Sequence, residues 1–339
     1  MSILSPADLK KRYNRFKYRH FLSCTVFCRN PLVLVSYETD FLRNAAAYPA
    51  YFDNCSAKSI HVFLQLGWEH ETEKNSVKFA ADLKDFLSKC DERVSLTLLA
   101  NSENEVRVLG SLGLRVVYCN QNAFVDETRY PLLHTEKQYD AIYIARLTPF
   151  KRHPLAARIP SLRLVGEFAY LDSEKDYAND LLTKHLKHAE WIGHVDAGDI
   201  PGEIAKAHCG LGLSAAEGAM FVSIEYLLCG IPIVNTPNIG GRDAMFPDFA
   251  VKTVPDTPEA VAEAVAEFVR EAPPPEEIRA ATLEKMNAHW RVFRDLLNEA
   301  MAPKVFPASR RFPHKLLLRC PIMPWQSLKY QLIRPRGIF

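Results

Sequence analysis

The sequence predicts an α/β protein of two domains, each with a parallel sheet whose two faces are covered by helices. The clearest evidence is the segment from Leu211 to Asp243, where an apolar run, a small polar loop, an apolar helical stretch and a second apolar run follow one another. Strand, loop, helix and strand form the repeating unit of such sheets. The length of 339 residues and the apolar content of 48% suit two domains of about 150 residues each.

The same segment carries two acidic residues at positions typical of a ligand site. A helix over Met220–Cys229 is stopped by Gly230, and Ile231–Val234 follows as a strand. Ligands of parallel sheets bind beyond the carboxyl ends of the strands, where a helix N-terminus offers backbone amides to an anion. Glu217 precedes this helix, and Glu225 lies eight residues further on. Two carboxylates placed in this way could hold the hydroxyls of a sugar and a ribose.

The spacing of Glu217 and Glu225, followed by Gly230-Ile-Pro-Ile-Val and by Gly240-Gly241, resembles the donor site of the retaining family 4 glycosyltransferases, the glycosyl transferases group 1. The resemblance implies a GT-B fold, in which two Rossmann-like domains face a central cleft. It also implies a nucleoside-diphosphate sugar as donor substrate and no cofactor. Glu217 would contact the hydroxyls of the donor sugar, Glu225 would contact those of the ribose, and the anomeric configuration would be retained.

A second motif supplies positive charge to the same predicted domain. Arg146 and Lys151 follow the expected strand Ala141–Ala145, so they would bring two cations to the carboxyl edge of the sheet. Two cations there could neutralise a diphosphate leaving group without a metal. The spacing also resembles the family, in which these two residues grip the pyrophosphate of the donor. Because the sequence contains no Asp-x-Asp pair, we expect the reaction to be independent of a metal.

The remaining candidate substrate-binding residues lie in turns of this domain. In the family, the turns after the strands Leu162–Val165 and Glu190–Ile192 flank the nucleotide base, which would place Gly166, Gly193 and His194 near it. His194 could equally be an exposed loop residue. The backbone amides expected to bind the diphosphate are those of Gly218, Ala219, Met220 and Phe221.

The predicted domains are residues 1–138, which bind the acceptor, and 139–303, which bind the donor; the tail 304–339 is expected to pack partly on the first domain. In that domain, the polar cluster Gly67 to Glu71 follows a predicted strand ending at Leu66. We take His70 as a candidate catalytic residue on the wall that faces the acceptor. An ordinary surface histidine explains its position equally well.

Three departures from the family pattern limit what the resemblance implies. Ala219 and Met220 stand where the family usually has Phe-Gly, and Tyr226 stands where it has Ala. The first domain is short and has no glycine-rich loop near its N-terminus. The identity of the sugar and the acceptor contacts therefore do not transfer from the family.

Positive charge is concentrated at the two ends of the chain. Residues 1–30 contain seven Lys or Arg and one acid, and residues 304–339 contain eight Lys or Arg and no acid, although the net charge is only +2. An N-terminal helix with interleaved basic and aromatic residues is typical of an anchor on an anionic membrane surface. The alternative is a terminal helix that packs on its own domain and exposes a solvated basic face.

The sequence also indicates the compartment. No apolar run approaches the ~18 residues needed to span a bilayer, and Phe21–Cys28 is too short for a signal peptide before Arg29. The eight cysteines are scattered and fit reduced core positions. We therefore expect a cytoplasmic protein, peripheral on the cytoplasmic face of the membrane.

Together these features predict a metal-independent glycosyltransferase that acts on a cell-surface glycan, either a lipid-linked oligosaccharide or a lipopolysaccharide core. One alternative is an inverting enzyme of the same fold, with Glu69, His70 or Glu71 as general base. Another is a non-catalytic protein that binds sugar nucleotides or acts as a scaffold. Binding of nucleic acid is not expected, because the acidic middle of the chain offers no continuous basic groove.

Overall fold

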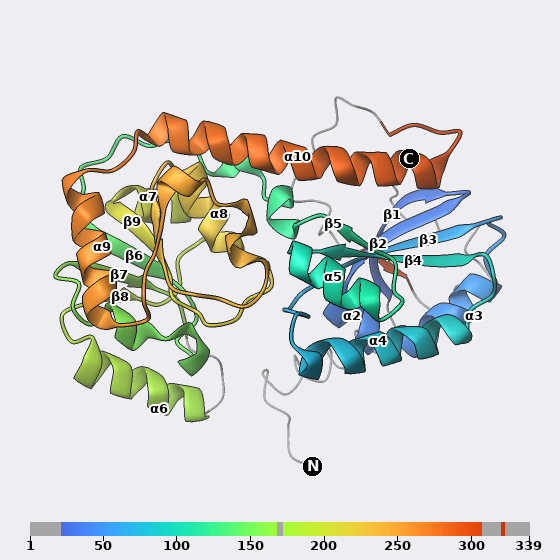
Figure 1. Cartoon of the computed structure of the whole chain (residues 1–339), viewed down its shortest axis with the longest axis horizontal. Helices are drawn as coiled ribbons and strands as arrows, with labels where there is room; N and C mark the ends of the chain where they lie inside the picture. Colours follow the sequence, from blue (N-terminus) through green and yellow to red (C-terminus); the bar gives the residue numbers. More distant parts are fainter. Residues whose placement is uncertain (1–21, 168–171, 307–319, 323–339) are drawn as a thin grey trace, which may run out of the picture. The chain divides into compact units, whose positions relative to one another are not determined.

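A computed structural model describes residues 22–167, 172–306 and 320–322, and it shows an α/β architecture with two sheets (Figure 1). The chain forms two compact units. Unit 1 contains residues 22–124 together with the described residues after 289, and unit 2 contains the described residues between 125 and 289. The predicted basic helix at the N-terminus lies outside the described residues.

Unit 1 is built on a six-stranded sheet in the order β12-β1-β2-β3-β4-β5. Strands β2 to β5 are parallel, and β1 is antiparallel to both of its neighbours. The strands are β1 (Leu22–Arg29), β2 (Leu32–Tyr37), β3 (Ile60–Gln65), β4 (Val94–Ala100), β5 (Val116–Tyr118) and β12 (Cys320–Ile322).

Helices cover both faces of this sheet (Figure 1). Along β2, Leu34 packs into one hydrophobic cluster with the helices that follow the strands, whereas Val33 and Val35 pack on the opposite face against Phe293 and its neighbours in the last helix. This alternation follows from the two-residue period of a strand. The helices are α2 (Glu38–Arg43), α3 (Tyr48–Asp53), α4 (Glu73–Ser88), α5 (Glu103–Ser111) and the part of α10 (Pro275–Met301) from residue 290 onward.

Unit 2 contains a second six-stranded sheet, in the order β11-β10-β9-β6-β7-β8, with every pairing parallel. Its strands are β6 (Tyr139–Ile144), β7 (Leu162–Val165), β8 (Glu190–Ile192), β9 (Ala207–Gly212), β10 (Ile233–Asn235) and β11 (Val251–Thr253). Its helices are α6 (Asp172–Asp180), α7 (Ile200–Ala205), α8 (Phe221–Leu228) and α9 (Pro258–Arg270). The two sheets make each unit Rossmann-like, as the sequence predicts.

Most elements of unit 2 lie where the sequence predicts them, and one does not. The sequence predicts a helix through Cys209, but α7 ends at Ala205 and β9 begins at Ala207. The strand begins early because residues 207–212 pair with β6 on one side and β10 on the other. The buried central place in the sheet outweighs the local helical pattern.

The units divide at residues 124 and 125, whereas the sequence places the domain boundary at 138. The sequence predicts an interdomain linker at Thr128–Gln138, which is polar and contains a proline. This segment is attached to unit 2, because Arg279 donates hydrogen bonds to the carbonyls of Glu127 (2.9 Å) and Tyr130. In the C-terminal tail, β12 pairs with β1 and so lies on unit 1.

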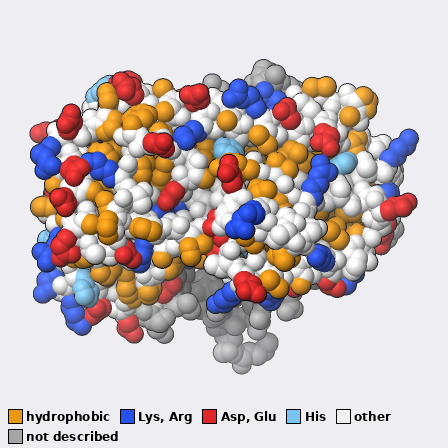
Figure 2. Space-filling view, viewed as in Figure 1, with side chains coloured by type: hydrophobic (Ala, Val, Ile, Leu, Met, Phe, Trp, Pro, Cys, Tyr) orange, Lys and Arg blue, Asp and Glu red, His pale blue; other side chains and the backbone are white. Residues whose placement is uncertain are grey.

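The surface and the cysteines bear on the predicted compartment and partners. None of the helices in the described part of the chain has the length and hydropathy of a membrane span. Among residues 22–306, the seven described cysteines are free, and all but Cys90 are buried. On the face shown in Figure 2, Lys and Arg side chains are interspersed with Asp and Glu over both units, rather than gathered in one basic stripe.

Candidate donor site in unit 2

The centre of the candidate site is an ion pair between two residues that the sequence analysis singles out. Lys151 ends the 3₁₀ turn Pro149–Lys151 after β6, and its Nζ contacts Oε1 of Glu217 in the loop after β9. Only 13% of the Lys151 side chain and 9% of the Glu217 side chain are exposed. The hydroxyl of buried Tyr143 in β6 donates a hydrogen bond to the Lys151 carbonyl (2.6 Å), which attaches the turn to the strand.

Arg242, which the sequence analysis missed, holds the loop that carries Glu217. Its side chain is completely buried, and Nη1 donates to the carbonyls of Gly212 and Ser214 at 2.8 Å each. Nη2 donates to the carbonyl of Thr236 at 2.6 Å, and the guanidinium also pairs with Asp243. One cation therefore ties the ends of β9 and β10 together. The only sequence signal is an Arg-Asp pair directly after the Gly-Gly turn.

Arg152 also bonds the segments that follow β9 and β10. Its Nε donates to the carbonyl of Leu213 (2.6 Å), and its guanidinium also bonds Thr236 Oγ1 (2.6 Å) and pairs with Asp256 (3.0 Å). The residue adopts the left-handed conformation, with φ 51°, which is unusual for a side chain other than glycine. Because its donors are used by the protein, Arg152 serves the loops rather than a ligand.

Arg146, the second predicted cation, lies apart from this network. Its side chain is exposed, and within the described ranges it makes no side-chain hydrogen bond or ion pair. Its backbone carbonyl accepts from Thr148 N at 2.8 Å, which turns the chain toward Lys151. The structure thus joins Lys151 to Glu217 and leaves the Arg146 guanidinium free of them.

The N-terminus of α8 follows Glu217 closely. Met220 is the N-cap and has φ 50° and ψ 77°, in the left-handed region, although it stands where the family usually has glycine. Its carbonyl accepts from Ser223 N (3.1 Å) and Ser223 Oγ (2.7 Å). Gly218, Ala219 and Met220 are buried, and Phe221, the first helical residue, is half-buried.

Glu225 lies inside α8, where it accepts a hydrogen bond from the Tyr130 hydroxyl (2.6 Å). Burial raises the pKa of Glu225, although the Tyr130 hydrogen bond and the charge of Arg129 act in the opposite direction. The structure does not bring Glu225 into the Lys151–Glu217 pair. Tyr130 is a second residue that the sequence analysis missed, because it lies in the presumed linker.

Tyr226, noted above as a departure from the family, is accommodated by a glycine on the neighbouring strand. The ring is completely buried, and a Cβ on Gly210 of β9 would lie 2.2 Å from it. The Tyr226 hydroxyl accepts the backbone N–H of Ile144 at 2.8 Å. The Tyr226 ring therefore fills the space that a Cβ at position 210 would occupy. Its hydroxyl satisfies the backbone amide of Ile144 at the end of β6.

The turns after β7 and β8 meet, as expected for neighbouring parallel strands. Gly166 N donates to the carbonyls of Ile192 (3.2 Å) and Gly193 (3.1 Å). With φ 146°, and with the Ala145 carbonyl 2.1 Å from a Cβ, the position admits only glycine. Trp191 Nε1 donates to the Gly166 carbonyl (2.9 Å). His194 is exposed and lies 3.4 Å from Asp196, as the surface interpretation expects.

His70 lies in unit 1 and is enclosed rather than exposed. The side chain is 4% exposed, the ring stacks on Phe79 at 4.0 Å, and Nε2 lies 3.0 Å from Glu38 Oε2. Burial opposes protonation of the imidazole, but the hydrogen bond and charge of Glu38 outweigh it and raise the pKa of His70. The expectation of a side chain facing the acceptor is not met, because both ring nitrogens are buried.

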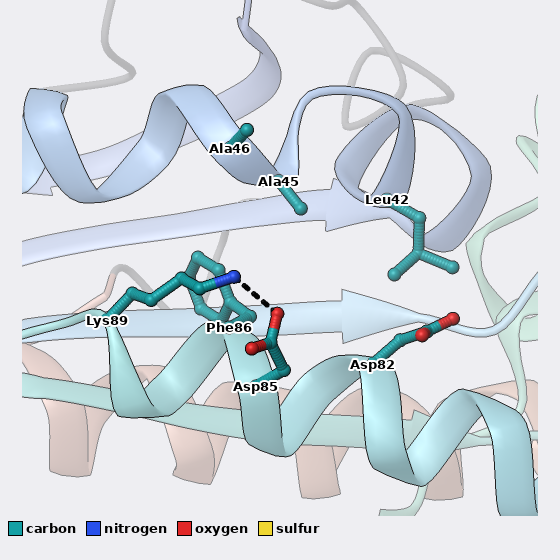
Figure 3. A pocket seen from close by; sticks show the side chains of 7 residues that line it. All are labelled: Leu42, Ala45, Ala46, Asp82, Asp85, Phe86 and Lys89. Atoms are coloured by element: carbon teal, nitrogen blue, oxygen red, sulfur yellow. Dashed lines mark hydrogen bonds and ion pairs between the residues drawn. The ribbon is translucent and has the colours of Figure 1, made fainter.

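Unit 1 also has a hollow between the segment 42–46 and α4 (Figure 3). Its lining combines apolar and charged side chains, among them the ion pair of Lys89 with Asp85 (2.5 Å). None of the predicted site residues lines it. Within the described residues, no group of three or more His, Cys, Asp or Glu side chains could hold a metal ion.

Comparisons with known proteins bear on the family and the fold. Residues 124–285, just under half of the chain, match the family model described as glycosyl transferases group 1. The sequence matches no curated protein.

Among solved structures, HepE of Anabaena in complex with UDP is 17% identical, with a TM-score of 0.58 over 80% of this chain and 79% of HepE. Sucrose-phosphate synthase of Thermosynechococcus elongatus is 15% identical, with a TM-score of 0.56 over 78% and 79%. TarM is 14% identical, with a TM-score of 0.59, but the match covers 79% of this chain and only 54% of TarM.

At these identities the structural likeness shows the fold, which is GT-B with two Rossmann-like domains. The family match covers nearly the whole of unit 2, the unit that contains the Lys151–Glu217 pair. The match of residues 124–285 to the glycosyl transferases group 1 model, together with the GT-B fold, supports a glycosyltransferase.

Proposed function

We propose that this glycosyltransferase moves a sugar from a nucleoside-diphosphate donor to a cell-surface glycan, without a metal and with retention of configuration. The observation that supports the donor site best is the enclosed pair of Lys151 and Glu217 at the carboxyl edge of the unit 2 sheet. One side chain suits a diphosphate and the other suits sugar hydroxyls. HepE, of the same fold, has been solved with UDP and glucose.

In the proposed reaction, the bond between the sugar and the diphosphate breaks and a bond from the sugar to an acceptor oxygen forms. Lys151, Arg146 and the amides of residues 218–221 stabilise the charge that develops on the departing diphosphate. Glu217 accepts hydrogen bonds from the donor sugar, and Glu225 accepts them from the ribose. The acceptor proton passes to the departing phosphate, so the protein need not supply a base.

The unit 1 candidates for a general base are engaged elsewhere. Glu69 accepts from the backbone N–H groups of Glu71 (2.9 Å) and Thr72 (3.1 Å), and Glu71 accepts from Asn104 Nδ2 (2.8 Å). His70 is enclosed with Glu38. These contacts favour the mechanism without a protein base over the inverting alternative, and we leave His70 out of the catalytic group.

The proposed acceptor and location rest on the basic termini of the chain. Fifteen Lys or Arg residues in 1–30 and 304–339 would bind an anionic membrane surface, where lipid-linked oligosaccharide or lipopolysaccharide core is assembled. Deletion of residues 1–20 is expected to release the protein from vesicles containing anionic lipid. Unchanged partition would favour the packed-helix alternative.

A thermal-shift screen against a panel of nucleotide sugars would identify the donor, because a ligand that binds only the folded state raises its melting temperature.

With that donor substrate, Lys151→Ala is expected to lower turnover about 10²- to 10³-fold, as the loss of one hydrogen-bond donor that stabilises the transition state does in other enzymes. Glu225→Ala should lower kcat/KM about tenfold or more, in line with the loss of hydrogen bonds to a charged group. Lys184→Ala, which removes an exposed pair with Asp180 in the same unit, is the control. Wild-type rates in both Lys151→Ala and Glu225→Ala would overturn the proposal.

A further inference from the structure

We propose that Tyr130 is a positioning residue for Glu225 and thereby sets the preference of this enzyme for ribonucleotide over deoxyribonucleotide donors. The inference rests on the proposed function, in which Glu225 binds the ribose hydroxyls. It goes beyond that function because it assigns a role to a residue outside the glutamate motif.

The contact itself is short and directed. Tyr130 is 6% exposed, and its hydroxyl donates to Glu225 Oε1 at 2.6 Å. This is the distance of a charge-assisted O–H···O⁻ bond. A carboxylate offers about four lone-pair positions. Tyr130 therefore occupies one of them, fixes the plane of the carboxylate and leaves acceptor positions for two ribose hydroxyls.

Tyr130 is itself attached to the helix that carries Glu225. Arg279 Nη1 donates to the carbonyls of Tyr130 and of Leu228, the last residue of α8, and Nη2 donates to the Glu127 carbonyl (2.9 Å). One guanidinium thus holds the turn Glu127–Arg129 and the end of α8 at a fixed separation. The phenol reaches Glu225 from a rigid support, which is the arrangement that preorganises a binding group.

The same contact affects the charge of Glu225. Burial raises the pKa of this carboxyl, whereas the Tyr130 hydroxyl and Arg129 lower it. The other titratable neighbours, Tyr226 and Cys229, have raised pKa values because they are buried and lie near Glu225. Loss of the Tyr130 hydroxyl should raise the pKa of Glu225 further, so that the carboxylate accepts ribose hydroxyls less well at low pH.

The test compares binding of UDP and 2′-deoxy-UDP, or the equivalent pair for the base that the screen selects, by isothermal titration of the full chain between pH 6 and 8.5. Hydrogen bonds to charged groups contribute about 1.5–3 kcal/mol, so wild type should prefer the ribonucleotide by about 10-fold or more. In Tyr130→Phe the preference should fall to about 3-fold or less, most at low pH. The donor KM should rise while kcat changes less than about 2-fold.

Tyr139→Phe is the matched control, because the exposed Tyr139 hydroxyl also donates to a glutamate of unit 2, Glu190 (2.9 Å). It should keep the wild-type preference. A merely structural role of Tyr130 would lower the melting temperature without changing the preference. In the Glu225→Gln background, Tyr130→Phe should have no further effect on the preference.

An unchanged preference in Tyr130→Phe, with the ribonucleotide still bound, would overturn the inference alone. Absence of binding of every nucleoside diphosphate to the wild-type protein would overturn the proposed function and this inference with it.

Discussion

The carboxyl edges of the two sheets have the same architecture, but their charged groups differ. In unit 1, the edge is occupied by carboxylates and a histidine: Glu38, Glu69, Glu71, Glu105 and His70. In unit 2, the edge carries cations as well as carboxylates. Three of the cations are paired, Lys151 with Glu217, Arg152 with Asp256 and Arg242 with Asp243, and the fourth is the exposed Arg146.

The difference lies in what the charged groups of each edge bond. In unit 1 the carboxylates accept from the protein's own amides: Glu105 accepts from His70 N (3.0 Å) and Asn101 N (2.6 Å). In unit 2 Arg152 and Arg242 bond loop carbonyls, and the Lys151–Glu217 pair lies beside the exposed Arg146. A diphosphate is therefore expected to favour the edge of unit 2, which has cations, over the edge of unit 1, where carboxylates predominate.

The largest effect on this comparison should come from removing the central cation of unit 2. Arg242→Ala leaves the carbonyls of Gly212, Ser214 and Thr236 without their donor and Asp243 without its partner. We expect the free energy of unfolding, measured in urea, to fall by ~3–5 kcal/mol. Arg242→Lys should not restore it, because an ammonium cannot reproduce the planar fork.

Arg158→Ala serves as the control for this prediction. Arg158 forms an exposed pair with Glu259 in the same unit, so its loss should cost less than about 1 kcal/mol. Equal stability of the Arg242→Ala and Arg158→Ala proteins would show that the buried cation does not organise the edge.

The acidic edge of unit 1 should appear in the pH dependence of stability. Burial raises the pKa of Glu105 to about 7, above the value of about 4.5 for the unfolded chain. The contribution of protonated Glu105 to the free energy of unfolding is therefore fully present below pH 4.5 and is lost as the pH rises through 7. The loss approaches ~3 kcal/mol at full ionisation, since one pKa unit corresponds to about 1.4 kcal/mol.

The melting temperature of the wild type should accordingly fall between pH 5 and pH 8 more than that of Glu105→Gln, in which the titrating group is absent. The raised pKa of His70 acts in the same direction and remains in both proteins. Parallel melting curves for the two proteins across this range would refute the assignment.

The smallest effect concerns the left-handed residue at the start of α8. Met220→Gly and Met220→Ala lose the same buried side chain, but only glycine adopts φ 50° without strain. We expect the glycine variant to be the more stable by ~1 kcal/mol. At Ala219, where φ is not positive, glycine should instead be less stable than the native alanine. The same order of stability at both positions would argue against strain at Met220.

The structural features that depend on local pattern can be predicted from the sequence. Asn101 or Ser102 is predicted to cap the helix that follows, and Ser102 does so by accepting from Glu105 N (3.0 Å). Asp256-Thr257-Pro258 is predicted to begin another helix, and Thr257 caps α9 by accepting from Ala260 N (3.2 Å). The spacing of Lys151 and Glu217 after neighbouring strands predicts residues that meet, because the carboxyl ends of parallel strands share one edge.

The features that the sequence does not predict depend on contacts between residues far apart in the chain. The bond of Tyr130 to Glu225, the fit of Tyr226 against Gly210 and the burial of Arg242 each join segments whose relation no local period reveals. Strand β1 was missed because its apolar run has no clear alternation. The burial of His70 cannot be predicted from its place after a strand, because it depends on contact with Glu38, far away in the chain.

The most direct test of the central claim, that the donor diphosphate binds at Lys151, is isothermal titration of UDP, or of the diphosphate that the screen selects, against three proteins: wild type, Lys151→Ala and Lys89→Ala. Lys89 is also paired with an aspartate, but it lies at the unit 1 hollow (Figure 3). We expect Lys151→Ala to weaken binding by about tenfold or more, as loss of a charge-assisted bond requires, and Lys89→Ala to bind like the wild type. Equal affinities in all three proteins, or an equal loss in both variants, would contradict the account.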